Sequence, residues 1–512
     1  MSLKAINVHL TSLSSRWLEL VKVLIVGEAS REHAITEALA RSSHEPKLYA
    51  VMKNLNPGIA RLCEQTGGCV VRGTFTDPNV VVDAASKFSV DLVFIGPEEP
   101  LFKGVADALV EAGFPVVGAL KAAAEVEMSK AFMRRLMWKY KIPGRLRFKA
   151  FKSVEDAIAY IAAYAESIAL KPARQAGGKG VKVIADLQVY LSKEKQEVKS
   201  KHAKVIHEKH MAEYTDIEDR ILIEERVEGP EYTLQTFTDG RTVKPLPLVQ
   251  DNKNAFEMDI GPETGGMGSI SGPGMTLPFI TKEELQASVD IIKGVVDAIW
   301  RETGVRYKGI ISGQMMLTAL WGPTIIEFYS RLGDPEACNV LPILKTDLLE
   351  VAEAIVSESL HKVDLEFEES ATVVKAIAPR GYPDRRELAK GHPVHVDEDS
   401  IKRRGCIVYY GSIDRREDGT LITAGSRVAE IVAKADDIPK ASELAEQCVQ
   451  FVKLLDGWGL FHRSDIGSPT LLKRRIEQAE LIREIYRYRA SKGLVGKVID
   501  WIPGRGKIET EL

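Results

Sequence analysis

The stretch VKVLIV, residues 21–26, is a continuous apolar run that ends at Gly27. Such a run is typical of a strand buried on both faces of a parallel sheet. Further strands and helices are expected to alternate after it: a helix at 32–41, strands at 48–52, 91–96 and 114–118, and a helix at 101–112. Alternation of this kind predicts βαβ units. We therefore expect a doubly wound α/β domain with a parallel sheet at 21–122.

The middle of the chain has a different pattern. A helix with one apolar stripe is expected at 129–140, and Pro143 ends it because proline cannot continue the hydrogen-bond ladder. The strands expected beyond it alternate more and contain more glycine: 167–173, 180–185, 219–227, 232–240 and 309–320. This pattern predicts an α+β domain built on antiparallel sheets. The stretch 188–218 is rich in Lys, Glu and His, which indicates a solvated helical face or a mobile lobe.

The two ends of the chain are expected to differ. Short strands after residue 370 predict a small β-rich domain at 371–467, and a charged helical tail is expected at 468–512, with the helix running to about Tyr488. Residues 1–20 precede the first strand and have no evident role. A short extension is the ordinary interpretation of residues 1–20, and a targeting peptide is the alternative.

Composition narrows the class of protein. The chain has 512 residues, too many for one core, with 45% hydrophobic and 28% charged residues, as in ordinary globular proteins. A net charge of -3 argues against nucleic acid as the main partner. The five cysteines are scattered, without a C-x-x-C pair, and no apolar run is long enough for a membrane span. We expect a cytoplasmic monomer or homodimer with free thiols, and no membrane partner.

Two segments carry the chemistry expected of a nucleotide site. In KPARQAGGKG (171–180), glycines allow backbone N–H groups to approach phosphate, and Lys171 and Lys179 add charge. No Ser or Thr follows Lys179, so this is not a Walker A loop. A hairpin turn would explain the glycines equally well, but not the two lysines. In EERVEGPE (224–231), acids at a strand end could hold an adenine amino group and a ribose, although charged strand ends are common.

Two further segments suit a metal and a small substrate. IIEFYSRLGDPE (325–336) places an acid at a strand end and then Arg331 and Asp334 on a turn. These side chains offer hard oxygen ligands and a fork for a carboxylate, and phosphoryl transfer needs such a metal. QDNK (250–253) leads into GPETGGMG (261–268), whose four glycines predict a loop that wraps a ligand with its main chain.

Read together with REHA (31–34), GPEEPL (96–101) and SKAF (129–132), these segments resemble the ATP-grasp ligases. Within them the chain is similar to the phosphoribosylamine–glycine ligase family, from about Val21 to about Gly467. The resemblance implies an ATP-grasp domain of two lobes at 123–370, with a mobile lobe at about 145–220. It implies ATP and Mg2+ or Mn2+ as cofactors. The implied reaction is carbon–nitrogen ligation in de novo purine synthesis: glycine and 5-phosphoribosylamine are joined through glycyl phosphate, giving glycinamide ribonucleotide, ADP and phosphate.

The resemblance also implies roles for individual residues. Those expected to bind the nucleotide are Lys130, Lys171, Gly177, Gly178, Lys179, Gly180, Glu224, Val227 and Glu231. Those expected to bind the substrates are Arg31, Glu32, Gly96, Pro97, Glu98, Asp251, Lys253, Gly265, Gly266, Met267, Gly268, Arg331 and Asp334. Lys171, Arg331 and Asp334 are expected to be catalytic, and Glu327 matches a magnesium ligand. No protein nucleophile is required.

Two positions depart from the family pattern. Tyr329 stands where the family has Asn, and a phenol is a poor magnesium ligand, so we hypothesise that Gln314 supplies an oxygen to the metal. Residues 27–30 are Gly-Glu-Ala-Ser where the family has Gly-x-Gly-Gly. Glu28 would repel a nearby phosphate by about 1 kcal/mol or more. Either Glu28 points away, or phosphate recognition has moved.

Three alternatives remain open at this point. The first is an ATP-grasp ligase with a different amine or acid. The second is a dinucleotide-dependent dehydrogenase, which the absence of G-x-G-x-x-G after the first strand disfavours. The third is an inactive nucleotide sensor, suggested by the missing Asn.

Overall fold

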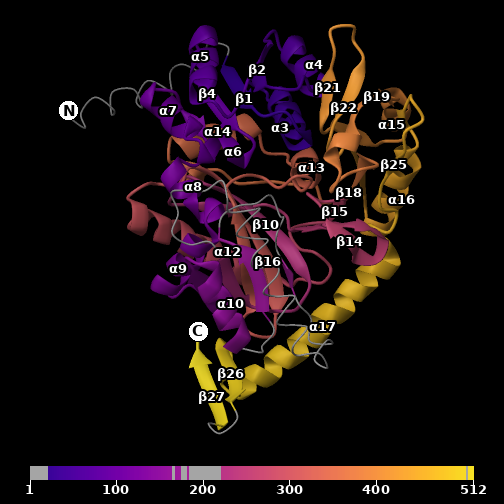
Figure 1. Cartoon of the computed structure of the whole chain (residues 1–512). Helices are drawn as coiled ribbons and strands as arrows, with labels where there is room; N and C mark the ends of the chain where they lie inside the picture. Colours follow the sequence, from indigo (N-terminus) through magenta and orange to yellow (C-terminus); the bar gives the residue numbers. More distant parts are fainter. Residues whose placement is uncertain (1–20, 164–167, 174–181, 184–220, 503–505) are drawn as a thin grey trace, which may run out of the picture.

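A computed structural model of the chain describes residues 21–163, 168–173, 182–183, 221–502 and 506–512 (Figure 1). The expected extension at 1–20 and the charged stretch at 188–218 lie outside the described residues, as do Gly177, Gly178, Lys179 and Gly180. The five cysteines are free thiols, as expected.

The N-terminal domain is a five-stranded parallel sheet in the order β3-β2-β1-β4-β5. Its strands are β1 (Lys22–Val26), β2 (Lys47–Met52), β3 (Val70–Arg72), β4 (Leu92–Ile95) and β5 (Val116–Val117). Leu24 and Val26 pack with α5 (Pro78–Phe88) and α7 (Val105–Glu111), whereas Val23 and Ile25 pack with α3 (Ser30–Ala40) and α4 (Pro57–Gln65). Both faces of β1 are therefore covered, which confirms the doubly wound domain.

One of the expected helices is divided into two in the structure. The helix expected at 101–112 is two helices, α6 (Glu98–Phe102) and α7, because Gly104 adopts a φ of 79° between them. Such a left-handed conformation interrupts a helix and suits glycine. Beyond β5, α8 (Lys121–Met128) leads to α9 (Lys130–Lys139), whose first turn is capped by the Ser129 hydroxyl accepting from the backbone N–H of Phe132 at 3.1 Å.

The ATP-grasp region has two sheets. The smaller is antiparallel, in the order β6-β9-β7-β8, with α10 (Val154–Ala163) packed against it. Its strands are β6 (Phe148–Phe151), β7 (Ile168–Pro172), β8 (Lys182–Val183) and β9 (Ile221–Glu225). Of the strand expected at 180–185, only 182–183 lies within the described residues. The larger sheet follows the path β17-β16-β10-β12-β15-β18-β23-β20, and α12 (Lys282–Thr303) packs on it.

The larger sheet runs through two parts of the chain. Its first strands are β10 (Glu231–Thr238), β12 (Val249–Asp251), β15 (Gly268–Ser271), β16 (Gly309–Thr318) and β17 (Gly322–Tyr329). β18 (Ala371–Pro379), β20 (Ile407–Tyr410) and β23 (Ala429–Ala435) continue it, joined by the pairing of β15 with β18. Outside this path, β11 (Val243–Pro245) pairs with β10, and β13 (Asn254–Phe256) pairs with β14 (Ile260–Glu263). The C-terminal domain therefore shares a sheet with the ATP-grasp domain.

The rest of the C-terminal domain is a second, antiparallel sheet in the order β21-β22-β19-β24. Its strands are β19 (Lys390–Val396), β21 (Ile413–Arg415), β22 (Leu421–Ala424) and β24 (Val452–Leu454), and the domain also contains α15 (Glu398–Arg403), α16 (Ile438–Val449) and β25 (Leu460–Phe461). Residues 421–435 form two strands, β22 and β23, with Gly425 at a φ of 102° between them. In the segment between β17 and β18, α13 (Ala337–Val340) and α14 (Leu348–Val356) pack against α3 of the N-terminal domain.

The tail begins as expected and ends differently. Helix α17 (Pro469–Ser491) runs diagonally along the lower edge of the molecule in Figure 1. Its Arg483 binds Glu284 of α12 at 2.7 Å. After it the chain forms an antiparallel hairpin, β26 (Lys497–Ile502) with β27 (Gly506–Glu511). The helix therefore ends close to the expected end at about Tyr488, and the hairpin after it was not predicted.

Candidate functional site

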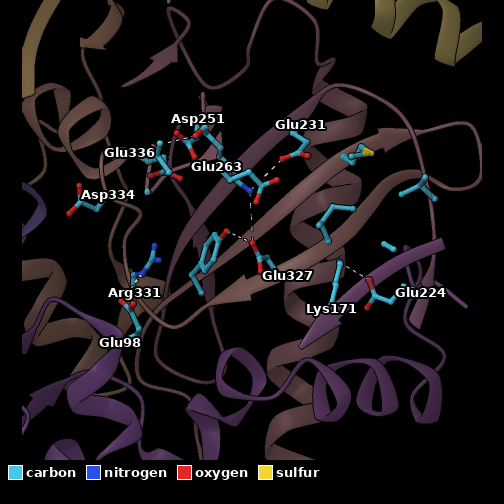
Figure 2. A pocket seen from close by; sticks show the side chains of 18 of the residues that line it. Glu98, Lys171, Glu224, Glu231, Asp251, Glu263, Glu327, Arg331, Asp334 and Glu336 are labelled. Atoms are coloured by element: carbon cyan, nitrogen blue, oxygen red, sulfur yellow. Dashed lines mark hydrogen bonds and ion pairs between the residues drawn. The ribbon is translucent and has the colours of Figure 1, made fainter. Parts of the chain in front are cut away.

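A cavity of about 350 Å3 lies where the parts of the molecule meet (Figure 2). Arg31 and Glu98 reach it from the N-terminal domain, Lys171 and Glu224 from the smaller sheet, and Arg427 from the C-terminal domain. The larger sheet and the loops beside it supply most of the other lining side chains. Side chains from all three domains therefore line this cavity.

One end of the cavity contains a buried carboxylate whose charge is balanced by two basic side chains of the protein. Glu224 on β9 is 1% exposed and binds Arg134 at 2.6 Å and Lys171 at 2.6 Å. Burial opposes ionisation, but the charges of Arg134 and Lys171 outweigh it and lower the pKa of Glu224 to about 2. Arg134 also donates to the backbone carbonyls of Ile325 and Ile326. Arg134 lies close to SKAF in the sequence, but nothing in that pattern indicated its partner.

Beside this network, carboxylates converge on Lys253. The Lys253 ammonium lies 3.5 Å from Glu231 and 3.9 Å from Glu327. Glu327 also lies 3.3 Å from Lys130 Nζ and accepts a 2.6 Å hydrogen bond from the Tyr329 hydroxyl. Burial again opposes ionisation, yet Lys130 and Lys253 hold the pKa of Glu327 below its usual value. Glu263 lines the same cavity. Carboxylate oxygens are the ligands that a divalent cation prefers, and the Lys253 ammonium lies among these carboxylates.

Gln314 lies next to this group rather than in the cavity lining. Its side chain is buried, its amide oxygen accepts from Thr233 at 2.9 Å, and its amide nitrogen donates to Glu231 at 2.8 Å. In this arrangement the side chain of Gln314 orients Glu231. A role for Gln314 as a metal ligand stays a prediction.

The other end of the cavity is built around two arginines. Arg331 lies 3.2 Å from Glu98, and its guanidinium is 4.3 Å from the centre of the Tyr329 ring. Arg427 binds Asp334 at 2.8 Å and donates to the carbonyls of Gly265, Gly266 and Asp334. Arg427 therefore joins the GPETGGMG loop to the RLGDPE turn.

An acidic side chain between these loops has an unused oxygen. Asp251 Oδ1 is buried and has no hydrogen-bond partner in the described part of the chain. Burial, and then the nearby Glu336, raise the pKa of Asp251 well above its usual value. Gly266 has a φ of 108°, and a Cβ there would lie 2.6 Å from Asp251 Oδ1. Glycine at this position therefore avoids a clash with the Asp251 carboxyl group.

The altered loop at 27–30 directs its carboxylate away from the cavity. Glu28 accepts from the backbone N–H groups of Lys53 and Asn54, both at 2.7 Å, and from the Asn54 amide at 2.6 Å. Of the two explanations for Glu28, the structure supports the one in which it points away. Glu32 is also turned inward: it accepts from the Ala29 N–H at 2.8 Å and from Arg31 at 2.5 Å, and is 1% exposed.

The cavity brings together many of the expected residues. They are Arg31, Glu98, Lys171, Glu224, Val227, Glu231, Asp251, Lys253, Gly265, Glu327, Arg331 and Asp334. The expected residues that do not line it are Glu32, Gly96, Pro97, Lys130, Gly266, Met267, Gly268 and Gln314. Arg427, Glu263 and Glu336 were not selected from the sequence. The two acids lie in the GPETGGMG and RLGDPE motifs, whereas Arg427 carries no such signal.

The two-lobed fold and the composition of this cavity define the chain as an ATP-grasp protein. Three family descriptions match it in succession: "Phosphoribosylglycinamide synthetase, N domain" at 21–127, "ATP-grasp (A) domain" at 128–337 and "C domain" at 372–469. The chain belongs to the phosphoribosylglycinamide synthetase family. The expected family and fold class are thereby confirmed.

Individual relatives agree. The chain is 43% identical to the phosphoribosylamine–glycine ligase of Methanopyrus kandleri over 465 residues, which are 91% of this chain and 100% of that protein. The corresponding ligase of Methanocaldococcus jannaschii is 44% identical over 467 residues, 90% of this chain and 100% of the relative. The crystal structure of the Thermotoga maritima ligase is 25% identical with a TM-score of 0.68, covering 87% of this chain and 100% of that one.

The fold extends to other enzymes. The biotin carboxylase domain of Hydrogenobacter thermophilus 2-oxoglutarate carboxylase, solved with MgADP, has a TM-score of 0.63 at 15% identity, covering 92% of this chain and 97% of that one. This likeness concerns the fold alone. Among the helices that the structure describes, none has both the length and the apolar character that crossing a membrane requires.

Proposed function

We propose that the protein joins glycine to 5-phosphoribosylamine in a reaction driven by cleavage of ATP, giving glycinamide ribonucleotide, ADP and phosphate. One observation carries the proposal. A single cavity contains the Lys171–Glu224 network, the carboxylates around Lys253 and the Arg331–Asp334 turn, in a chain 43–44% identical to ligases of this name.

The chemistry has two steps. A carboxylate oxygen of glycine attacks the γ-phosphorus of ATP, the bond to ADP breaks, and glycyl phosphate forms. The amine nitrogen of phosphoribosylamine then attacks the acyl carbon, phosphate leaves, and the amine loses a proton. Neither step needs a protein nucleophile, so the rate derives from positioning and from stabilising charge.

The nucleotide is assigned to the end with the apolar wall. Leu146, Val227 and Ile326 line the cavity there, beside Lys171. We assign the adenine to this wall and the phosphates to Lys171 and Lys130, whose ammonium groups would neutralise phosphate charge.

The glycine is assigned to the opposite end. Arg331 offers a guanidinium fork to its carboxylate, and the unused oxygen of Asp251 fits its ammonium. Arg31, 3.9 Å from Glu98 in the same cluster, is the basic group assigned to the ribose phosphate. Glu98 keeps Arg31 and Arg331 in place between catalytic cycles.

A divalent cation, Mg2+ or Mn2+, is assigned to Glu327 and Glu231, where it would offset charge on the phosphate oxygens. Tyr329 orients Glu327 through its hydroxyl. We further propose that the enzyme acts in the cytoplasm as a monomer or homodimer, with small-molecule substrates and without nucleic acid.

Release of ADP tests the proposal. Purified protein receives ATP and Mg2+, then glycine and freshly made phosphoribosylamine, first separately and then together. Release that needs both, with glycinamide ribonucleotide as the product, supports the proposal. Release that is faster with another amine or acid would instead indicate a different ATP-grasp ligase.

A further inference from the structure

The last part of the chain lies outside the family pattern. The matched C domain ends at residue 469, and relatives matched over their whole length cover 90–91% of this chain. Helix α17 and the β26–β27 hairpin follow, and the hairpin lies at the foot of the ATP-grasp domain (Figure 1). The hairpin is therefore an addition whose position can be examined for a role.

One face of the hairpin is buried against the ATP-grasp domain. Val498 and Leu512 are 7% and 4% exposed and form an apolar cluster with Leu146 and Leu320. Trp138, Val227, Trp321 and Ile326 pack against this cluster. The backbone N–H of Gly496 donates to the carbonyl of Leu320 at 2.9 Å, which fixes the start of the hairpin.

The hairpin also holds the segment that leads into the smaller lobe. The Arg145 guanidinium lies between two indoles, 5.7 Å from the Trp138 ring centre and 5.2 Å from that of Trp321. Arg145 donates to the backbone oxygen of Leu512 and, at 2.8 Å, to that of Ile142. Trp138 and Trp321 in turn donate to the carbonyls of Leu146 and Arg145, each at 2.8 Å.

Three side chains connect this cluster with the cavity. Leu146, Val227 and Ile326 line the cavity at its nucleotide end, and the same three side chains belong to or pack against the hairpin cluster. Leu146 is only 1% exposed, so its position depends on packing from behind. The hairpin thus lies one layer of side chains away from the wall assigned to adenine.

We infer that the β26–β27 hairpin is a positioning element for the nucleotide: it packs behind Leu146, Val227 and Ile326 and so raises the affinity for ATP and ADP. This inference rests on the proposed function, because that proposal assigns adenine to the wall. Wall side chains that lose packing on one side lose contacts and gain rotamer freedom, and nucleotide binding must then order them.

A matched pair of neighbouring residues tests the inference. Val498→Ser places a hydroxyl in the apolar cluster, whereas Ile499→Ser changes the adjacent side chain, which is 39% exposed. The dissociation constant of ADP is measured by calorimetry on the full chain, with neither glycine nor amine present. We expect Val498→Ser to weaken binding about 5- to 20-fold and Ile499→Ser to change it less than twofold.

Kinetics provide the second readout. Val498→Ser should raise KM for ATP by a similar factor while leaving KM for glycine and kcat at saturating ATP within twofold. Val498→Ile, which keeps an apolar side chain in the cluster, should restore the wild-type value. A loss of folded protein alone would lower the apparent kcat and leave KM for ATP and KM for glycine unchanged, so it would not separate ATP from glycine.

A second substitution covers the case in which Val498→Ser does not fold. Gly496 has a φ of 68°, and a Cβ there would lie 2.5 Å from the Trp321 ring. Gly496→Ala should therefore displace the hairpin from Trp321 and weaken ADP binding, with Gly493→Ala, where a Cβ meets open space, as the control. Unchanged ADP affinity in a folded Gly496→Ala protein, even one with a lower melting temperature, overturns the inference.

The two proposals fail in different ways. A wild-type protein that binds ADP but forms no glycinamide ribonucleotide overturns the proposed substrates and leaves the hairpin inference standing. Equal weakening of ADP binding by Val498→Ser and Ile499→Ser overturns the hairpin inference and leaves the ligase proposal unaffected.

Discussion

The two ends of the cavity treat charge in opposite ways. At the nucleotide end, Glu224 is paired with Arg134 and Lys171, and its pKa is lowered to about 2. At the substrate end, Asp251 has an unused buried oxygen and a pKa raised well above its usual value. The comparison indicates that the charge of Glu224 is balanced by the protein itself, whereas the free oxygen of Asp251 is left for a ligand.

The elements that build the two ends differ accordingly. Glu224 and Lys171 lie on paired strands, β9 and β7, so their positions are set by a backbone ladder. The substrate end is assembled from the loop at 261–268, the turn at 331–336 and Arg427, which come from different parts of the chain. Substitutions of Glu224 or Arg134 should therefore affect folding, and those at the second end should affect substrate binding.

The largest effect is expected for Glu224→Gln. The change leaves Arg134 and Lys171 buried without their carboxylate partner, which should lower the free energy of unfolding at pH 7 by about 3–5 kcal/mol. Urea unfolding measures this loss. Glu228→Gln, which removes a carboxylate from an exposed pair with Arg226, should cost less than about 1 kcal/mol.

The difference in stability between the wild type and Glu224→Gln should depend on pH. The pKa of Glu224 is lowered from 4.5 to about 2, so its stabilising contribution is complete above pH 4.5 and is lost as the pH falls towards 2. The difference in stability between wild type and Glu224→Gln should therefore narrow across that window. A constant difference would show that Glu224 is not ionised in the folded protein.

Arg331→Ala should have the next largest effect, on catalysis. Loss of the guanidinium removes the group assigned to the glycine carboxylate and should lower kcat/KM for glycine by about 100- to 1,000-fold, from about 3–4 kcal/mol. ADP affinity should stay within twofold. Arg301→Ala, on the exposed side of α12, is the control. An equal loss of ADP affinity would remove the distinction between the two ends.

Much of this arrangement was predictable because motifs in the sequence mark it. Buried apolar runs such as 21–26 predicted the parallel sheet, and glycine-rich or charged segments at strand ends predicted most of the cavity lining. Arg134 and Arg427 were not predictable in the same way, because their partners are 90 and 93 residues away in the sequence. Long-range ion pairs leave no periodic signal in one sequence.

Two further differences between the expected and the observed elements have separate causes. The break between α6 and α7 follows from the left-handed conformation of Gly104, and one glycine in a helical pattern does not reveal its φ. The hairpin at 497–511 was not predicted, because no strand pattern was recognised after the expected end of the helix at about Tyr488. Its apolar contacts lie on the ATP-grasp domain, far away in sequence.

Asp251→Asn tests the substrate end of the cavity, and we expect a smaller effect than that of Arg331→Ala. Loss of the charge assigned to the glycine ammonium should raise KM for glycine by about 10- to 100-fold, from about 1.5–3 kcal/mol, without changing KM for ATP. Because the pKa of Asp251 is raised, glycine affinity of the wild type should increase with pH as this group loses its proton. The Asp251→Asn variant should lack that increase. Asp290→Asn, on the exposed side of α12, should retain it.

The smallest effect is expected for Tyr329→Phe, which lies between the two ends. It removes one hydroxyl that donates to Glu327 at 2.6 Å, so we expect about 3- to 10-fold weaker Mg2+ or Mn2+ binding, from about 0.5–1.5 kcal/mol. Calorimetric titration of Mn2+ into the ADP complex measures it. Tighter binding in the variant would show that the hydroxyl competes with the cation for the carboxylate.

The shared sheet has a mechanical consequence. β15 follows directly after the GPETGGMG loop and pairs with β12 on one side and with β18 on the other. A rigid-body rotation of the C-terminal domain would therefore move the GPETGGMG loop, because hydrogen-bonded strands connect the two and no flexible linker separates them. A displacement of β18 or β23, which lie away from the ligand, should therefore change how closely the GPETGGMG loop packs on that ligand.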